Sequence, residues 1–367
     1  MAVSDAASRA ARWVRPQVQS LRGYRVAEPG DAIKLDAMES PWPWPGALEA
    51  AWLERLRSVA INRYPDAAAR ELKPLLRDAL GVPAGAGVIL GNGSDELIQL
   101  IDLAVAGGGR TVLAPAPSFA MYRVIAEVAG AEYVEVPLGP DFELDLPPTL
   151  EALAAYQPAV TYLAHPNNPT GNGLDLDAVA EVVAQADGLV VVDEAYAPYA
   201  DTTFLPRVLD HPNCLLLRTL SKVGLAGLRV GALIGHPAWL EELEKCRLPY
   251  NLSTPAQASA AFALEHRQAL DRAVSQVLAE RGRLAEALPA VRGVQQVWPT
   301  QTNFLTFRVP QGCGEAVHRG LLERGVLIKS LHGSHPRLAD CLRVTVGRPE
   351  ENDRFLSALG EALSLLR

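Results

Sequence analysis

One lysine of this sequence stands where a lysine could do covalent chemistry. Lys222 follows the apolar run 215–217 and is crowded by Leu220, Val223 and Leu225. Burial disfavours the charged form of an amine, so a lysine kept out of water loses its proton more easily and can condense with a carbonyl. The alternative is an ordinary surface lysine in a loop, and this stretch alone does not separate the two.

A carboxylate and a phenol form the second candidate group. The apolar run 189–192 leads straight into Asp193, and Tyr196 follows three residues later. A carboxylate at the end of a buried strand needs a cationic partner. That partner would be either an arginine or the protonated ring nitrogen of a cofactor, to which Tyr196 could add a hydroxyl.

A glycine-rich segment, Leu90-Gly-Asn-Gly-Ser-Asp-Glu96, could hold an anion. Glycines permit a tight turn between a strand and a helix, and the first N–H groups of a helix point outward toward a phosphate. The backbone of Ser94, Asp95 and Glu96 would then do the binding, because acidic side chains repel phosphate. Alternatively, Ser94 or Asp95 only caps the helix.

A further loop, His165-Pro-Asn-Asn-Pro-Thr-Gly171, brackets two asparagines with prolines. Such a loop is irregular and rigid, and it can present a side-chain amide to a ligand. His165 itself could be a ligand or could simply fill the loop.

These motifs lie between elements that predict a parallel sheet. Amphipathic segments such as 95–106, 119–129 and 176–186 alternate with short apolar runs, which indicates an α/β fold with a mainly parallel sheet between helices. Ligands of such sheets bind at the carboxyl ends of the strands. The seven candidate strands are 88–90, 111–114, 133–136, 159–163, 189–193, 214–217 and 230–234.

The two ends of the chain have a different character. Helical patterns at 238–247 and 255–288 precede shorter strands and a closing helix from Glu350, which predicts a smaller α+β domain. The pattern at 10–24 predicts an N-terminal helix. We divide the chain into an N-terminal arm with part of the small domain (1–45), a large domain (46–270) and a small C-terminal domain (271–367).

Composition excludes several classes of function. The 367 residues are 49% hydrophobic and 21% charged, with a net charge of -8, so the chain offers no basic surface for nucleic acid or an anionic membrane. It contains no apolar stretch of about eighteen residues and no secretory apolar segment. The four cysteines lie far apart without metal-ligand spacing. We expect no metal site and a cytoplasmic protein.

Four motifs, GNGSDE, HPNNPTG, VVDEAY and TLSK followed by LAGLR, occur in the order found in one enzyme family. Together they resemble the fold-type I, pyridoxal-phosphate-dependent aminotransferases over most of the chain. NRYPD, TLSKVGLAGLRVG and CLRVTVGRPEEN are most similar to the histidinol-phosphate aminotransferase group. This resemblance implies a homodimer that exchanges an amino group between glutamate and imidazole-acetol phosphate, forming 2-oxoglutarate and L-histidinol phosphate in histidine biosynthesis.

The resemblance also implies a role for each matching residue. Lys222 would bind the aldehyde of pyridoxal 5'-phosphate and, once released, carry the proton, while Asp193 would keep the ring nitrogen protonated. Asn168 and Tyr196 would bind the ring oxygen, and Phe119 would stack on the ring. The implied phosphate ligands are the backbone of Ser94, Asp95 and Glu96 together with Thr219, Ser221 and Arg229, and Tyr64 of the partner subunit.

The substrate is implied less directly. Arg343 and Tyr24 match the family's substrate-binding residues, with Asn168 beside them, whereas Lys329 stands where the family often has an arginine. Lysine supplies a point charge without a bidentate fork, and Lys329 could equally be a solvated residue at a strand end. Phe119 also replaces a frequent tyrosine. An aromatic amino-acid aminotransferase, a threonine-phosphate decarboxylase and a silent regulator with the cofactor fold remain alternatives.

Overall fold

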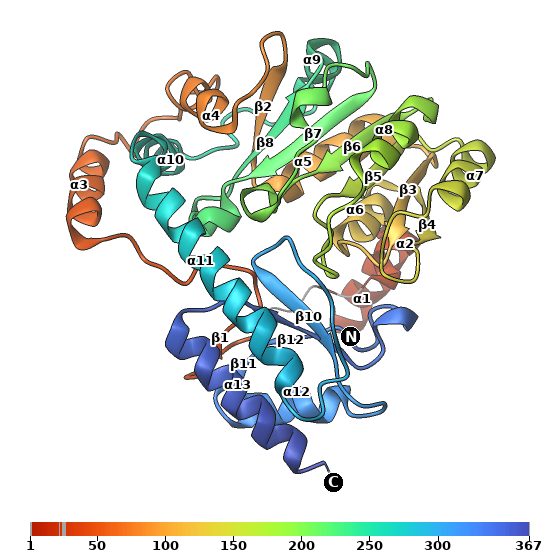
Figure 1. Cartoon of the computed structure of the whole chain (residues 1–367). Coiled ribbons are helices and arrows are strands. Elements are labelled where there is room, and N and C mark those ends of the chain that lie inside the picture. The colour runs from red at the N-terminus through yellow and green to blue at the C-terminus, as the bar shows by residue number, and fades with distance from the viewer. Residues whose placement is uncertain (1, 22, 24–26, 367) are drawn as a thin grey trace.

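The computed structural model describes residues 2–21, 23 and 27–366, and shows a large part built around a sheet with a smaller part packed beneath it (Figure 1). Within these residues the large part contains a seven-stranded sheet with the strand order β2-β8-β7-β6-β5-β3-β4. Its strands are β2 (Gly87–Asn92), β3 (Thr111–Ala116), β4 (Glu132–Pro137), β5 (Val160–Ala164), β6 (Leu189–Asp193), β7 (Cys214–Thr219) and β8 (Val230–Gly235).

The sheet is mainly parallel, as the sequence predicts. Only β8 runs antiparallel to its neighbours, β2 and β7, among the described strands. Helices cover both faces, so successive residues of one strand enter opposite cores. Val190 and Val192 of β6 pack toward the helices α4 (Leu72–Leu80), α7 (Leu146–Tyr156), α8 (Leu176–Gln185) and α10 (Thr254–Glu265). Leu189 and Val191 pack toward α5 (Ser94–Ile101), α6 (Met121–Ala129) and α9 (Pro237–Glu244).

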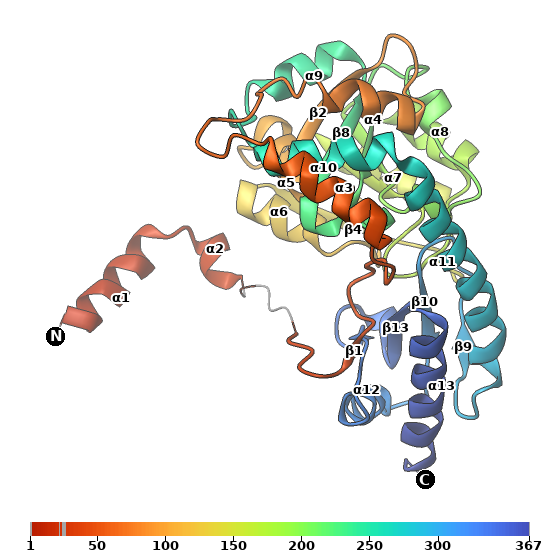
Figure 2. The ribbon, with the colours of Figure 1, turned by 90° about the vertical axis from the view of Figure 1, so that its left-hand side faces the viewer.

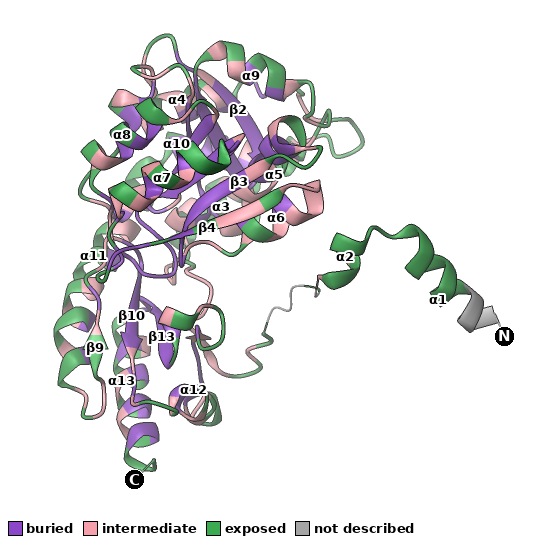
Figure 3. Cartoon of the chain, turned by 90° about the vertical axis from the view of Figure 1, so that its right-hand side faces the viewer, coloured by how far each residue is buried: buried purple, intermediate pink, exposed green. Residues whose placement is uncertain are grey.

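Because helices cover both faces of the sheet, its strands are unbroken apolar runs in the sequence. Every residue of β5 and β6 is buried, and the strands form the buried centre of the large part in Figure 3. A strand that is solvated on one face would alternate apolar and polar residues instead. The carboxyl ends of β5, β6 and β7 therefore bring the predicted motifs to one edge of the sheet.

The smaller part has its own sheet and core. Its strands are β9 (Gln296–Val297), β10 (Phe304–Arg308), β12 (Lys329–Ser330) and β13 (Cys341–Thr345), with the antiparallel order β12-β13-β10-β9. The short strand β1 (Ile33–Lys34) pairs in parallel with β11 (Val326–Leu327). Helices α12 (Gly314–Glu323) and α13 (Pro349–Ser364) complete the core. The N-terminal segment therefore contributes to the smaller part.

One helix, α11 (Arg267–Ala287), runs from the large part into the smaller one (Figure 2). Leu270 belongs to the core of the large part, whereas Val277 and Leu284 belong to that of the smaller part. The single helix predicted at 255–288 is wrong, because the chain leaves helical geometry at His266, between α10 and α11. The division 1–45, 46–270 and 271–367 stays a prediction, and its second boundary falls within the first turns of α11.

In Figure 2, the helix at the start of the N-terminal arm points away from the rest of the chain, whereas Arg15, further along the arm, donates a hydrogen bond to the Val128 carbonyl of α6. The structure has two helices here, α1 (Ala2–Trp13) and α2 (Pro16–Ser20), followed later by α3 (Gly46–Arg57). The single helix predicted at 10–24 is therefore wrong in its described part. Pro16 explains the break, since proline has no N–H for a preceding carbonyl and suits the first turn of a new helix.

Candidate active site

A cavity opens at the carboxyl ends of the central strands. Its empty volume, including the open mouth, is about 580 Å³, which suits a small organic ligand. It brings together most of the residues that the sequence singles out. The lining residues are Met38, Ser94, Asp95, Phe119, Tyr122, Ala164, Pro166, Asn168, Asp193, Ala195, Tyr196, Thr219, Ser221, Lys222 and Arg229.

Lys222 reaches this cavity from a short helical turn, Ser221–Val223, that directly follows β7. The hydroxyl of Tyr199 donates to the Lys222 carbonyl at 2.6 Å and so fixes the backbone of the turn. The Lys222 amine lies 5.4 Å from the centre of the Tyr196 ring. Burial, helped by the nearby positive charge of Arg343, lowers the Lys222 pKa from 10.5 to about 8. A substantial fraction of this amine is therefore neutral near pH 8.

Asp193 ends β6 and is only 6% exposed. Its Oδ2 accepts a hydrogen bond of 2.6 Å from the Tyr122 hydroxyl, and its Oδ1 accepts one of 3.0 Å from the Ala195 backbone. Burial raises the Asp193 pKa to about 6 despite these two bonds. The site thus holds a carboxylate and an amine whose charged forms are both disfavoured by lack of water. Such opposed shifts in one cavity are typical of functional groups.

The start of α5 forms an anion cradle beside Lys222. Helix α5 begins at Ser94, directly after Gly93, and these residues pack closely on Gly231 of β8. A Cβ at position 231 would lie 2.7 Å from the Gly93 carbonyl carbon and 2.8 Å from the Ser94 nitrogen, so no larger residue fits there. The Ser221 hydroxyl accepts from Thr219 at 2.9 Å and from Arg229 at 3.4 Å. The first N–H groups of α5, the Ser221 hydroxyl and the Arg229 guanidinium are donors of the kind that bind a phosphate.

The two acidic side chains of this segment are engaged by other residues. Asp95 lies 3.2 Å from the Arg229 guanidinium, and Glu96 accepts a hydrogen bond of 2.7 Å from Asn251. Asp95 lines the cavity, whereas Glu96 does not. The cradle can therefore present backbone N–H groups while its carboxylates are bound by neighbouring side chains.

Arg343 and Lys329 come from the smaller part and do not belong to the cavity lining. Arg343, on β13, donates to the side-chain oxygen of Asn168 and, at 3.1 Å, to the Asp36 carbonyl. Lys329, on β12, is the direct cross-strand partner of Arg343. Side chains of directly opposed residues in an antiparallel pair lie on the same face, so two cations stand next to each other.

Tyr64 is a further predicted residue that is not in the cavity lining. The Tyr64 side chain is 80% exposed and stacks on Tyr250 with 4.5 Å between ring centres. Tyr24 lies outside the residues that the structure describes. Conversely, sequence reasoning missed Tyr122, the partner of Asp193. Its position in the apolar pattern of α6 indicates only a core residue, and its spacing of three residues from Phe119 is the one available signal, although α6 begins only at Met121.

Two features are absent from the described residues. No group of three or more histidine, cysteine, aspartate or glutamate side chains among them is arranged to hold a metal ion. Among the same residues, none of the helices has the length and apolar character needed to cross a bilayer.

The fold and the cavity define a class of α/β protein in which a lysine and an aspartate line one cavity beside a helix N-terminus that suits an anion. The family model described as aminotransferase class I and II matches residues 36–359. The chain therefore belongs to the class I and II aminotransferases.

Relatives resemble this chain over nearly its whole length, and a solved structure resembles its fold. The chain is 52% identical to histidinol-phosphate aminotransferase 2 of Nitrosococcus oceani, covering 96% of this chain and 97% of the relative. It is 47% identical to the histidinol-phosphate aminotransferase of Chromobacterium violaceum, covering 94% and 96%. The fold is similar to that of the Sinorhizobium meliloti histidinol-phosphate aminotransferase in complex with pyridoxal-5'-phosphate, with a TM-score of 0.86, 24% identity, and 97% and 98% of the chains covered.

Proposed function

We propose that this chain is a cytoplasmic, pyridoxal-phosphate-dependent aminotransferase of histidine biosynthesis. It exchanges an amino group between glutamate and imidazole-acetol phosphate, giving 2-oxoglutarate and L-histidinol phosphate. The observation that carries the proposal is one cavity in which Lys222 and Asp193, with oppositely displaced pKa values, lie beside an anion cradle. The names of relatives that are 47% to 52% identical over nearly the whole chain support the substrate.

The cavity residues fit pyridoxal phosphate, which carries an aldehyde, a basic ring nitrogen and a phosphate. The cradle at the start of α5, with Ser221 and Arg229, would hold the phosphate, and Asp193 would face the ring nitrogen. Phe119 would pack on the ring, while Asn168 and Tyr196 would bind its oxygen. When bound, this cofactor withdraws electrons from the substrate carbon that loses a proton.

Lys222 has two properties that its proposed roles require. Its lowered pKa leaves enough neutral amine near pH 8 to attack an aldehyde and later to accept a proton from carbon. The hydrogen bond from Tyr199 to its carbonyl fixes the turn from which the side chain projects. Lys222 can therefore serve first as the covalent anchor and then as the general base.

The substrate end of the site is proposed at Arg343 and Lys329. Arg343 and Lys329 are directly opposed on neighbouring strands, so an anion bound beside them would be attracted by both positive charges. Arg343 suits a carboxylate or phosphate because its guanidinium is a planar fork, and Lys329 adds a second positive charge for a dianion. We propose that the phosphate of histidinol phosphate binds there, with Asn168 and Tyr24 close to the substrate.

We further propose a homodimer with shared active sites. Tyr64 of the partner subunit would reach the cofactor phosphate, and the high exposure of this side chain within a single chain is compatible with that role. Ile61 and Leu248 are also strongly exposed apolar residues, at 84% and 72%. Covering them in a subunit interface would remove apolar surface from water.

A substrate panel followed by absorbance of the cofactor tests this proposal. Each amino donor is mixed with the enzyme alone, so that a single half-reaction is measured. We expect histidinol phosphate to react with a much higher kcat/KM than phenylalanine. Equal or faster reaction of phenylalanine would identify an aromatic amino-acid aminotransferase instead, and reaction with no donor would indicate a silent regulator.

The variant Lys329→Met separates the phosphate role from general effects. It should raise KM for histidinol phosphate about tenfold or more, because a charge-assisted contact to the dianion is lost. The KM for phenylalanine, which carries no phosphate, should hardly change. An equal effect on both donors would contradict the placement of the phosphate at Lys329.

A further inference from the structure

The hydroxyl of Tyr122 is the strongest side-chain contact of Asp193, and the proposed mechanism gives it no role. Tyr122 lies on α6 with a side chain that is 0% exposed. It donates a hydrogen bond of 2.6 Å to Asp193 Oδ2 and also lines the cavity. A phenol inside a protein is usually satisfied by some partner, but this one is bonded to the carboxylate that would face the cofactor.

A second tyrosine and aspartate lie directly beside this pair. The Tyr162 ring stacks on the Tyr122 ring with centres 4.6 Å apart and planes 6° apart. Its hydroxyl donates to Asp102 Oδ1 at 2.7 Å, and Asp102 is also 0% exposed. Tyr162 and Asp102 do not line the cavity. The chain thus contains two similar buried pairs, and only one of them touches the site.

We propose that Tyr122 is a positioning residue for the transamination reaction. It holds Asp193 as an anion in a fixed orientation, so that the proton between Asp193 and the cofactor ring nitrogen stays on the nitrogen. This inference rests on the proposed function. A hydrogen bond donated to a carboxylate stabilises its charged form. Without that bond Asp193 becomes more basic and takes the proton from the ring, which then withdraws electrons less well.

The groups around Asp193 shift its pKa in both directions. The hydrogen bonds from Tyr122 on α6 and from the Ala195 backbone lower its pKa, and Lys222, after β7, lowers it further. Burial and the negative charge of Asp95 on α5 raise it. Tyr122 is the contributor that can be removed without changing a charge or a cofactor contact proposed above.

The test compares Tyr122→Phe with Tyr162→Phe in the complete enzyme. Each variant loses one buried hydroxyl and keeps its ring and the stacking. The enzymes are loaded with pyridoxal phosphate labelled with ¹⁵N in the ring, and solid-state NMR follows the protonation of the nitrogen as pH is raised. We expect Tyr122→Phe to lose the ring proton at a lower pH than the unaltered enzyme and Tyr162→Phe. Its kcat should fall about tenfold while KM changes little, as for a lost hydrogen bond to a charged group.

A third variant, Tyr122→His, and the binding of the cofactor by the unaltered protein complete this test. Tyr122→His keeps a ring N–H that can donate to Asp193, and it should restore ring protonation and part of kcat even where Tyr122→Phe folds poorly. If the cofactor binds and all variants titrate alike, Tyr122 has only a packing role and the inference is overturned. If the unaltered protein binds no pyridoxal phosphate, the proposed function fails and the inference fails with it.

Discussion

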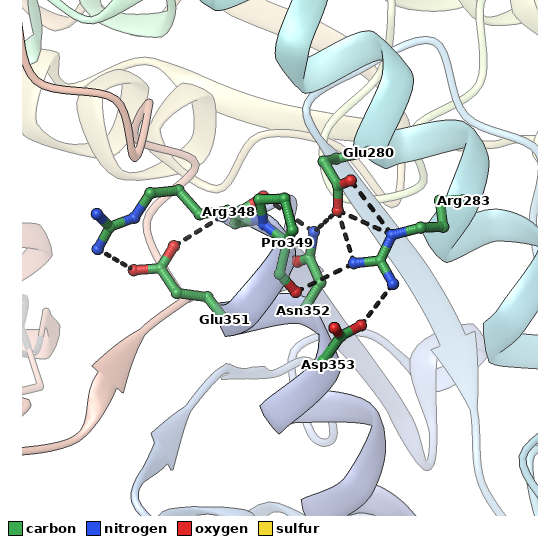
Figure 4. A network of polar contacts seen from close by, with 8 residues as sticks. Glu280, Arg283, Arg348, Pro349, Glu351, Asn352 and Asp353 are labelled. Atoms are coloured by element: carbon green, nitrogen blue, oxygen red, sulfur yellow. Dashed lines mark hydrogen bonds and ion pairs between the residues drawn. The ribbon is translucent and has the colours of Figure 1, made fainter.

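Charged side chains gather in two regions of this molecule. Their pKa shifts favour the charged forms in one region and the neutral forms in the other. In the smaller part, Glu280 and Arg283 of α11 meet Asn352 and Asp353 of α13 (Figure 4). Glu280 accepts bonds of 2.8 Å from both Arg283 and Asn352. The hydrogen bond from Arg283 lowers the Glu280 pKa, and bonds to Glu280 and Asp353 raise the Arg283 pKa. Every shift in this network favours the charged form, so the network contributes to stability.

In the cavity, the shifts favour the neutral forms. Burial raises the Asp193 pKa to about 6 and lowers the Lys222 pKa to about 8. These groups cost stability in the absence of a ligand, whereas a ligand with a cationic ring and an aldehyde would satisfy both. The direction of the pKa shifts therefore distinguishes these two kinds of ionic cluster, and variants can test this distinction.

The largest effect is expected at Lys222. Lys222→Ala should lower kcat about 10⁴-fold or more, because both the covalent anchor and the general base are lost. Turnover of histidinol phosphate measures it. Lys245→Ala is the control, since Lys245 is an exposed lysine paired with Glu242 on the surface, and it should keep normal turnover. Normal turnover of Lys222→Ala would refute the assignment of the site.

Asp193→Asn should have the next largest effect. An amide cannot hold the ring nitrogen protonated, so proton removal should slow by about 10³-fold while cofactor binding is partly retained. Single-turnover absorbance measures the step. The control is Asp102→Asn, which alters another buried carboxylate that is not in the cavity lining. Similar slowing in both variants would mean that the effect is structural.

The same Asp193→Asn variant should be more stable than the unaltered protein when the cofactor is removed. The folded-state pKa of Asp193 is about 6 against an ordinary 3.8. The folded state therefore binds this proton more tightly than the unfolded state does. The destabilisation of the folded state by the ionised carboxylate is complete above pH 6 and diminishes as pH falls toward 4. We expect a gain of about 3 kcal/mol at pH 7.5, measured by urea unfolding, that shrinks as pH falls. A loss of stability at pH 7.5 would contradict the comparison.

The smallest effect is expected in the network of Figure 4. Arg283→Met should lower the free energy of unfolding by about 1 kcal/mol, because its partners are partly solvent-screened, and less at high salt. Urea unfolding at two salt concentrations measures this, and kcat should stay unchanged. A stabilised Arg283→Met protein, or one with lowered kcat, would remove the distinction between the two regions.

Much of the fold could be predicted from the sequence, because strands covered on both faces are unbroken apolar runs. The seven predicted strands correspond to β2 to β8 with ends shifted by few residues. Helix α7 is not among the segments named from the sequence, and its Pro147 and Pro148 lie in the first turn, where prolines fit a helix. The break at His266 has no glycine or proline signal. There the ring packs on Phe262 and bonds to its carbonyl at 2.9 Å.

The site was predictable where motifs mark it and not where distant packing creates it. Asp193 and Lys222 each follow an apolar strand, so their arrival at one edge of the sheet follows from the topology. Tyr122 lies 71 residues before Asp193 in the chain, and nothing in the pattern of α6 indicates a hydroxyl aimed at a carboxylate. Glu96 shows the converse, because its place in a motif did not reveal that Asn251 binds it.

Helix α11 has a mechanical consequence. Its 21 residues form a rod of about 30 Å, with one end fixed in each core. Any movement of Arg343 and Lys329 toward Lys222 must therefore swing or bend this rod. A proline near residue 275 would act as a joint in it, loosening the grip on the substrate while leaving the pyridoxal phosphate cradle intact.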